Sequence, residues 1–177
     1  MFGGRDSNVS ERIDDVANAA RIVASTLDAN NYGSTSFTIG GKTFFAAGGT
    51  GGTNNRFYDE ITNLWTSKAP ITSNSSWNGS YEIDGYGFAA TGFSNVGSTI
   101  NTNYRYDSAA DAWATRAVHP SAVYDPGSAN LRGIGYVFSG TTSTNGALTG
   151  LTTAVYSYNP SFDAWTSLGN IAPPPIS

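Results

Sequence analysis

The sequence has no cysteine, and His119 is its only histidine among 177 residues. The lack of cysteine excludes disulfides, thiol chemistry and cysteine-ligated metals. A single histidine excludes a multi-histidine metal site and leaves only His119 for a Ser-His-Asp triad. We therefore expect no metal, no cofactor and no catalytic residue, and we interpret His119 as a structural residue.

Charge is also scarce. Charged residues make up 12% of the chain, Lys42 and Lys68 are the only lysines, and the net charge is −4. Phosphate binding needs clustered cations, so nucleic acid is excluded as a partner and anionic membrane surfaces are disfavoured. No stretch approaches the ~20 apolar residues of a membrane span, so no membrane insertion is expected. The N-terminus lacks the basic start and apolar core of a signal peptide.

Glycine and aromatic residues are abundant: there are 21 glycines, and aromatic residues make up 13% of the chain. This composition is typical of short strands joined by tight turns. With 39% hydrophobic residues, the chain can bury one core. The composition predicts an all-β domain whose surface is made polar by Ser, Thr, Asn and Gly.

An internal repeat dominates the sequence. Each of three segments carries Tyr, then Asp or Asn, then Asn or Asp four residues later, then Trp two residues beyond. The tryptophans recur at intervals of 48 and 52 residues. The matching residues are Tyr58, Asp59, Asn63 and Trp65, then Tyr106, Asp107, Asp111 and Trp113, then Tyr158, Asn159, Asp163 and Trp165.

A second pattern precedes each of these segments. A turn signal (Gly40-Gly41, Asp84-Gly85 or Arg132-Gly133) leads into an apolar run that ends in a small pair. The predicted small pairs are Gly48-Gly49, Thr91-Gly92 and Ser139-Gly140. Together the two patterns predict one four-stranded sheet per repeat. The small pairs would lie where neighbouring sheets crowd together, and the Tyr and Trp side chains would pack between sheets.

At these residues the chain resembles the kelch repeat over about residues 34–174. The resemblance implies a β-propeller with about three complete four-stranded blades and one partial N-terminal blade. The sequence departs from the family at Thr91 and Ser139, where kelch repeats usually have glycine. Small residues are retained there, so the packing argument still holds.

The predicted repeats span residues 34–77, 78–120 and 121–177, and residues 1–33 form a partial, degenerate first repeat. In the first repeat, Ile13-Asp14 and Ala20 occupy the Tyr-Asp and Trp positions. The alternative is an amphipathic helix over residues 9–27, because apolar residues recur there at spacings of three and four. The match in period favours the degenerate repeat.

This count falls short of the usual kelch ring. The chain would be a fragment, a compact four-bladed ring, or a subunit that another chain completes. A proline-rich tail is a poor source for the missing inner strand, because proline lacks a ladder donor. We therefore expect a homo-oligomer or a part of a larger assembly.

The loops after the small pairs are the predicted binding end, because loops on a rigid scaffold usually carry function. They cover residues 50–55, 93–103 and 141–152. Trp77 lies outside the repeat frame. It is either an exposed residue that contacts a ligand or a residue that holds its own loop in place by packing. The Asp and Asn residues of the repeat are interpreted as turn caps. The candidate ligand-binding residues are Arg56, Trp77, Phe93, Asn101, Asn103 and Asn145.

The resemblance also bears on function. Galactose-oxidase-like kelch enzymes need a cysteine and two histidine ligands, which this chain lacks. The lysine-poor, Ser/Thr/Asn-rich style is similar to kelch-like proteins of bacteriophage tails and bacterial surfaces. The sequence therefore favours a non-catalytic module of a virion or cell surface that recognises a protein or a glycan. The alternatives are a purely structural subunit and a carbohydrate-active enzyme.

Overall fold

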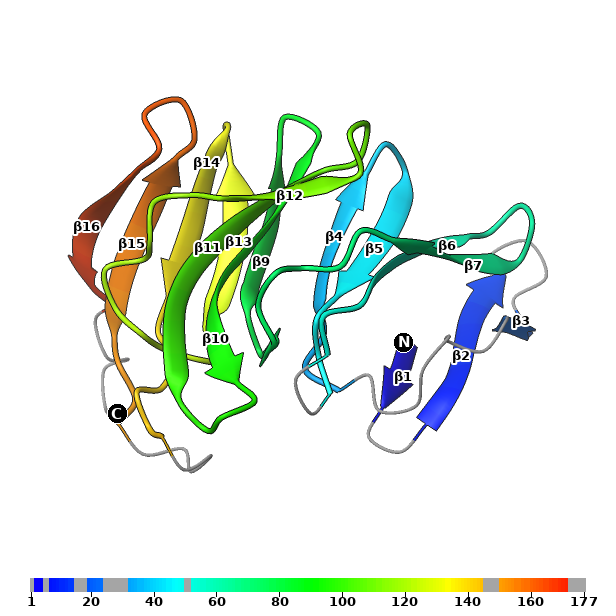
Figure 1. Ribbon diagram of the computed structural model, residues 1–177, viewed down its shortest axis with the longest axis horizontal. Coiled ribbons are helices and arrows are strands. Elements are labelled where there is room, and N and C mark those ends of the chain that lie inside the picture. The colour runs from blue at the N-terminus through cyan, green and yellow to red at the C-terminus, as the bar shows by residue number, and fades with distance from the viewer. Residues whose placement is uncertain are drawn as a thin grey trace.

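The computed structural model describes residues 2–4, 7–14 and 19–23 by their backbone, and residues 32–49, 52–144 and 150–171 in full. The described residues form open antiparallel sheets in chain order (Figure 1). The N-terminal sheet contains β1 (Phe2–Gly4), β2 (Ser7–Asp14) and β3 (Ala19–Val23). The first full sheet contains β4 (Thr35–Ile39), β5 (Lys42–Ala46), β6 (Asn55–Asp59) and β7 (Leu64–Lys68).

The second full sheet contains β9 (Gly79–Ile83), β10 (Tyr86–Ser94), β11 (Thr99–Asp107) and β12 (Ala112–Thr115), and the short β8 (Ser75–Ser76) also pairs with β10. The third contains β13 (Gly127–Leu131), β14 (Ile134–Phe138), β15 (Ala154–Asn159) and β16 (Ala164–Asn170). The described part of the chain contains no helix, and so none that could cross a membrane. The all-β class is confirmed.

The three full sheets share one register, which makes their positions equivalent. Each repeat tyrosine lies opposite its repeat tryptophan: Tyr58 opposite Trp65, Tyr106 opposite Trp113, and Tyr158 opposite Trp165. In the N-terminal sheet, Ile13 lies opposite Ala20 in the same way. The helix alternative is therefore wrong for residues 9–14 and 19–23, which are strand. Helical spacing there is overridden by strand pairing of β2 with β1 and β3.

Neighbouring sheets interlock through an aromatic ring over a glycine. Phe37 of β4 is buried over Gly87 of β10, and a Cβ on that glycine would lie 2.2 Å from the ring. Tyr81 of β9 lies over Gly135 of β14 in the same manner, where the distance would be 2.4 Å. Strand β9 lies against both β4 and β13, so β4, β9 and β13, one strand from each of the three full sheets, are neighbours. Large side chains of one sheet thus fit into gaps that glycine leaves in the next.

A second contact joins the second and third full sheets to the segments that leave the sheets before them. Oδ1 of Asp111 accepts hydrogen bonds from the Tyr106 hydroxyl (2.7 Å) and the Ala69 N–H (2.9 Å). The Trp113 indole N–H donates to the Ala69 carbonyl at 3.0 Å. Tyr158, Asp163, Trp165 and Ala117 repeat this arrangement between the second and third sheets.

These contacts correct the prediction for half of the repeat carboxylates. Asp59 and Asp107 do cap their own turns through backbone N–H groups, and those groups lower the pKa of Asp59. Asp111 and Asp163 instead bind a tyrosine hydroxyl and a distant peptide. The Tyr106 hydroxyl holds the pKa of Asp111 below its ordinary value. Their charge therefore joins two sheets rather than closing a turn.

The tryptophans lie at equivalent positions, as predicted, but they are not equally buried. Trp65 is buried, whereas Trp113 and Trp165 are only partly buried. Both lie on the outer strands β12 and β16, and their indole N–H groups reach the chain that leaves the preceding sheet.

In the first repeat, the predicted small pair Gly48-Gly49 lies one residue later in the shared register than the pairs of the other two repeats. The register makes Gly48 equivalent to Gly92 and Gly140, and Gly49 equivalent to Phe93 and Thr141. The residues before the shared glycine, Ala47, Thr91 and Ser139, all have φ between 57° and 64°. A Cβ on Gly48 would lie 2.9 Å from the Ser34 backbone, so the crowding comes from the chain that enters the same sheet.

The predicted loop over residues 93–103 is mostly strand. Strands β10 and β11 continue past an irregularity between Ala90 and Gly92, and Phe93 pairs with Thr99. Only residues 95–98 form the turn, at the lower edge of Figure 1, opposite the β9–β10 turn. A bulge adds a residue to a hairpin without ending its pairing. For this reason the sequence pattern did not predict that β10 and β11 extend beyond residue 92.

Candidate functional site

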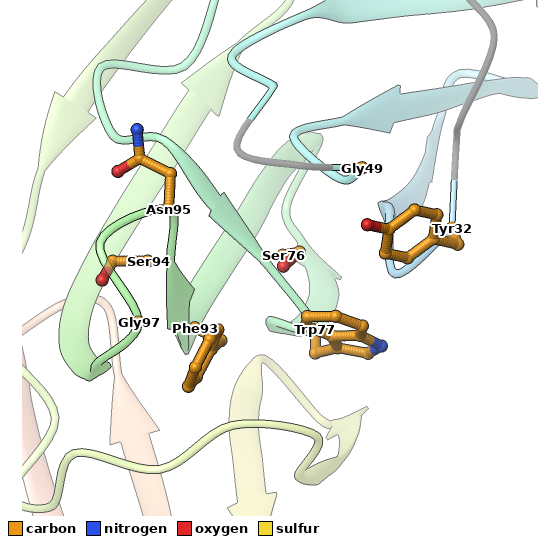
Figure 2. A pocket seen from close by; sticks show the side chains of 8 residues that line it. All are labelled: Tyr32, Gly49, Ser76, Trp77, Phe93, Ser94, Asn95 and Gly97. Atoms are coloured by element: carbon orange, nitrogen blue, oxygen red, sulfur yellow. The ribbon is translucent and has the colours of Figure 1, made fainter. Parts of the chain in front are cut away.

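A pocket of about 220 Å³ lies at the end of the sheets that carries the 95–98 turn. We call it the loop-end pocket and define it by its lining residues: Tyr32, Gly49, Ser76, Trp77, Phe93, Ser94, Asn95 and Gly97. Figure 2 shows the three aromatic rings along one side, Ser94 and Asn95 along the other, and Ser76 between them. The residues come from the approach to β4, from the end of β5, and from β8 and the β10–β11 hairpin.

The pocket arises because the repeats carry different residues at two backbone positions that face each other. The chain that enters each sheet faces the residue after the shared glycine: Tyr32 faces Gly49, Ser76 faces Phe93, and Tyr124 faces Thr141. Each pair combines one aromatic residue with one small residue. In the second repeat the aromatic residue is on the opposite strand, so two small residues, Gly49 and Ser76, line one pocket together with Tyr32 and Phe93. Gly49 has no side chain and Ser76 has a short one, which leaves the space that forms the pocket.

Trp77 lies in a backbone conformation that a bulky residue rarely adopts. Its φ is 52°, and the equivalent residues are Gly33 (φ 64°) and Asp125 (φ 54°). Glycine and aspartate tolerate this left-handed region, but an L-residue with a large side chain pays about 1–2 kcal/mol for it. Such strain is commonly kept where it serves a function.

Hydrogen bonds fix the Trp77 backbone on both sides. Its N–H donates to the Gly33 carbonyl at 2.7 Å, and its carbonyl accepts from the Asp125 N–H at 2.9 Å. The indole packs on Gly33, where a Cβ would lie 3.0 Å from it. The Trp77 ring is therefore held in place before any ligand arrives.

Other aromatic rings support the indole. The ring centroid of Trp77 is 5.6 Å from that of Tyr32 and 6.1 Å from that of Phe93. Tyr124 lies behind them, 4.9 Å from Phe93 in an edge-to-face contact. Tyr32, Trp77 and Phe93 are each partly exposed, whereas Tyr124 is buried. The cluster thus has a buried base and an accessible aromatic surface.

The polar side of the pocket is a turn that hydrogen bonds hold in shape. Ser94 and Ser98 are joined through their backbones and their hydroxyls, with Ser94 Oγ 2.9 Å from Ser98 Oγ. Gly97 has φ of 82°, a conformation that glycine adopts without strain. The turn carries the exposed side chain of Asn95 to the rim. An amide there offers both a donor and an acceptor to a ligand.

Two of the six predicted ligand-binding residues, Trp77 and Phe93, line this pocket. Arg56 is buried in β6 at 4% exposure and Asn103 is fully buried in β11, so a surface ligand cannot reach either. The Asn103 amide donates to the Ala117 carbonyl instead. Asn101 is partly buried in β11, and its carbonyl accepts from the His119 N–H. All three residues lie in strands and none belongs to the pocket lining, so the structure does not bring them together with Trp77 and Phe93, and Asn145 lies outside the described residues.

Sequence analysis missed Tyr32, Ser76 and Asn95. Tyr32 and Tyr124 occupy equivalent positions, and a repeat alignment centred on Gly48, Gly92 and Gly140 would have shown Ser76 as the exception between them. The one-residue offset in the first small pair concealed this signal. Asn95 lies in a Ser/Asn/Gly turn whose sequence resembles any other loop of the chain.

His119 is buried at 2% exposure between the second and third sheets. Its backbone position matches that of Ile71, since their N–H groups donate to Asn101 and Thr53 in the same way. Tyr156 and Trp165 contact its ring edge-to-face, each at 4.7 Å. Within the described residues no group of three metal-ligating side chains occurs. Here a histidine takes the core position that isoleucine takes one repeat earlier.

No family model matches the chain, and no curated protein matches it. Among solved structures, the chain is similar in fold to one described as "Structure of YjhT", with a TM-score of 0.71 and 15% sequence identity. The similarity covers 81% of this chain and 52% of that one, so the chain spans about half the length of the solved protein. At this identity the likeness concerns the fold alone.

Proposed function

We propose that the chain is a non-catalytic recognition module of a virion or cell surface and that it binds a glycan or a glycosylated protein in the loop-end pocket. The observation that carries the proposal is Trp77. A bulky residue occupies a strained position where the other repeats have glycine or aspartate, and its ring lines the pocket. The indole packs on Gly33 and on neighbouring aromatic rings, and it is the part left exposed that we assign to the ligand.

The composition of the pocket supports binding rather than catalysis. Its lining contains no carboxylate, so it offers no pair of acids for glycoside hydrolysis. We also propose that the full sheets are blades of a kelch-type β-propeller. The adjacency of β4, β9 and β13 and the repeated ring-over-glycine contacts support that arrangement.

The Trp77→Asn variant tests this function. The labelled chain is expected to bind a subset of features on a printed array of cell-surface glycans and glycoproteins, and Trp77→Asn should reduce those signals at least tenfold. Asparagine tolerates the left-handed conformation, and the released strain of about 1–2 kcal/mol offsets part of the lost packing. Thermal unfolding should therefore change little.

The matched control is Phe162→Ala, which removes an exposed aromatic ring from the β15–β16 turn. Its array signals should equal those of the unmodified chain. Equal signals from Trp77→Asn would instead place recognition elsewhere and refute the proposal. Moderate salt should have little effect, because the pocket lining is uncharged.

A second candidate function, a structural subunit, is favoured by one face of the third sheet. Leu131 is 60% exposed there, whereas the equivalent Ile39 and Ile83 are buried beneath the next sheet. Tyr136 and Phe138 on the same face are only partly buried. An uncovered apolar face of this kind is typical of an interface. We propose that a further copy of the chain, or another component of an assembly, covers it.

Light scattering tests the second candidate. The chain is expected to associate at micromolar concentration, and Leu131→Asp should shift it to monomer without lowering its melting temperature, because Leu131 is exposed. A chain that stays monomeric would rule out self-association through this face. It would leave the recognition proposal unaffected.

A further inference from the structure

We propose that the loop-end pocket binds one uncharged pyranose ring, stacked on the aromatic residues and hydrogen-bonded along the polar side. This inference rests on the proposed recognition function and names its ligand class. It draws on the size of the pocket, the two kinds of lining and the lack of charge.

The size of the pocket indicates a single-ring ligand. At about 220 Å³ it lies below the roughly 300–1,000 Å³ of sites for drug-sized molecules. The aromatic rings occupy one side and the Ser94–Gly97 turn the other (Figure 2). A pyranose has an apolar face of C–H groups and a rim of hydroxyls, so one ring matches both sides at once.

The aromatic side provides a stacking surface that is fixed in advance. Trp77 is anchored through Gly33 and Asp125, and Phe93 is held edge-to-face by Tyr124. Rigid aromatic rings lose little conformational entropy when a ligand packs on them. Asn95 is exposed at the rim, and Figure 2 shows its side chain pointing away from the aromatic rings, so its amide must turn inward to donate to one sugar hydroxyl and accept from another.

The electrostatics select an uncharged sugar. None of the eight lining residues carries a charge, and the chain as a whole is at −4. A sugar carboxylate would lose its hydration without gaining a cationic partner, which is unfavourable. Uronic and sialic acids should therefore be rejected.

An aromatic cluster can also bind a quaternary ammonium group through cation–π contacts. The polar side argues against that ligand. A trimethylammonium group has no hydrogen-bonding atoms, so Ser76 and Asn95 would lose water without replacement. A pyranose replaces that water with its own hydroxyls.

Isothermal titration of the full chain with single-ring probes tests the inference. The probes are the methyl glycosides of glucose, galactose, mannose and N-acetylglucosamine, together with glucuronic acid, N-acetylneuraminic acid and choline. At least one uncharged glycoside should bind with a Kd of about 1 mM, as expected for a ligand of this size. The acids and choline should bind at least tenfold more weakly.

Two variants locate the binding. Trp77→Asn should weaken the glycoside at least tenfold and Asn95→Ala about threefold, while Phe162→Ala should leave its Kd unchanged. Tighter binding of an acid or of choline would overturn the inference. If no glycoside binds while the array signals still depend on Trp77, the sugar inference fails and the recognition function stands. If no signal depends on Trp77, both fail.

Discussion

Replacing Phe37 by alanine should lower the free energy of unfolding by about 3–5 kcal/mol, as expected for a large aromatic residue in the core. Phe37 is buried against Phe44, Tyr106 and Trp113, so its ring joins the first sheet to the second. Gly87→Ala should cost about 1–3 kcal/mol by overpacking, because its Cβ would lie 2.2 Å from the Phe37 ring. Chemical denaturation with fitted m-values measures both changes.

The double variant Phe37→Ala with Gly87→Ala tests whether the two residues share one space. Without the ring, the methyl group added at position 87 has space, so Phe37→Ala with Gly87→Ala should be no less stable than Phe37→Ala alone. Thr43 provides the natural precedent, because it carries a side chain at the position equivalent to Gly87. Additive losses would mean that the two residues do not share one space.

His119→Ile should raise the free energy of unfolding by up to about 1 kcal/mol at pH 7.5, because losing the contacts of Nδ1 with the Ser121 backbone (2.7 and 3.1 Å) offsets part of the gain. Burial lowers the pKa of His119, and its Nε2 has no hydrogen-bond partner within the described residues. An unpartnered buried polar atom costs about 1–3 kcal/mol. Isoleucine already occupies the equivalent core position at residue 71, where it is buried.

The same substitution should remove a pH dependence. The unfolded chain binds a proton at His119 near pH 6.5, whereas the folded chain resists protonation until lower pH. The folded state therefore has its full stability above about pH 6.5. It loses up to about 1.4 kcal/mol per pH unit as the pH falls toward the folded pKa, and below that pKa the loss stops.

Unfolding curves between pH 5 and pH 8 test this assignment. His119 is the only histidine, and the pKa values of Asp59, Asp111 and Asp163 lie below the ordinary value, so those carboxylates titrate at lower pH. The His119→Ile chain should be nearly flat across this range. The reciprocal Ile71→His variant should be more pH-dependent than the unmodified chain. An equally steep curve for His119→Ile would contradict the assignment.

The sequence predicted the parts of the fold that local pattern controls. The Tyr-Asp and Trp residues lie in one strand–turn–strand unit, so their spacing alone determines that Tyr58 pairs with Trp65. The same frame correctly predicted strands around Ile13 and Ala20, despite the helical spacing of apolar residues.

The parts that were missed depend on contacts between distant residues. Asp111 binds the N–H of Ala69, 42 residues earlier, and no local pattern distinguishes it from the turn cap Asp107. Asn103 is typical of a loop in sequence but is buried because β11 extends beyond the bulge. The pocket itself depends on which strand of each facing pair carries the aromatic residue, and this becomes visible only once the shared glycines are aligned.

The most direct test of sugar binding at the loop-end pocket is the set of indole N–H signals in an amide-proton NMR spectrum of the labelled chain. The sequence contains four tryptophans, so four indole signals are expected, and the Trp77→Phe variant identifies the one from Trp77. Titration with the best-binding uncharged methyl glycoside should shift the Trp77 signal progressively. The signals of Trp65, Trp113 and Trp165 should stay in place, because those residues pack between strands and sheets. A Trp77 signal that stays unchanged while the glycoside binds would contradict the assignment of the loop-end pocket as the sugar-binding site.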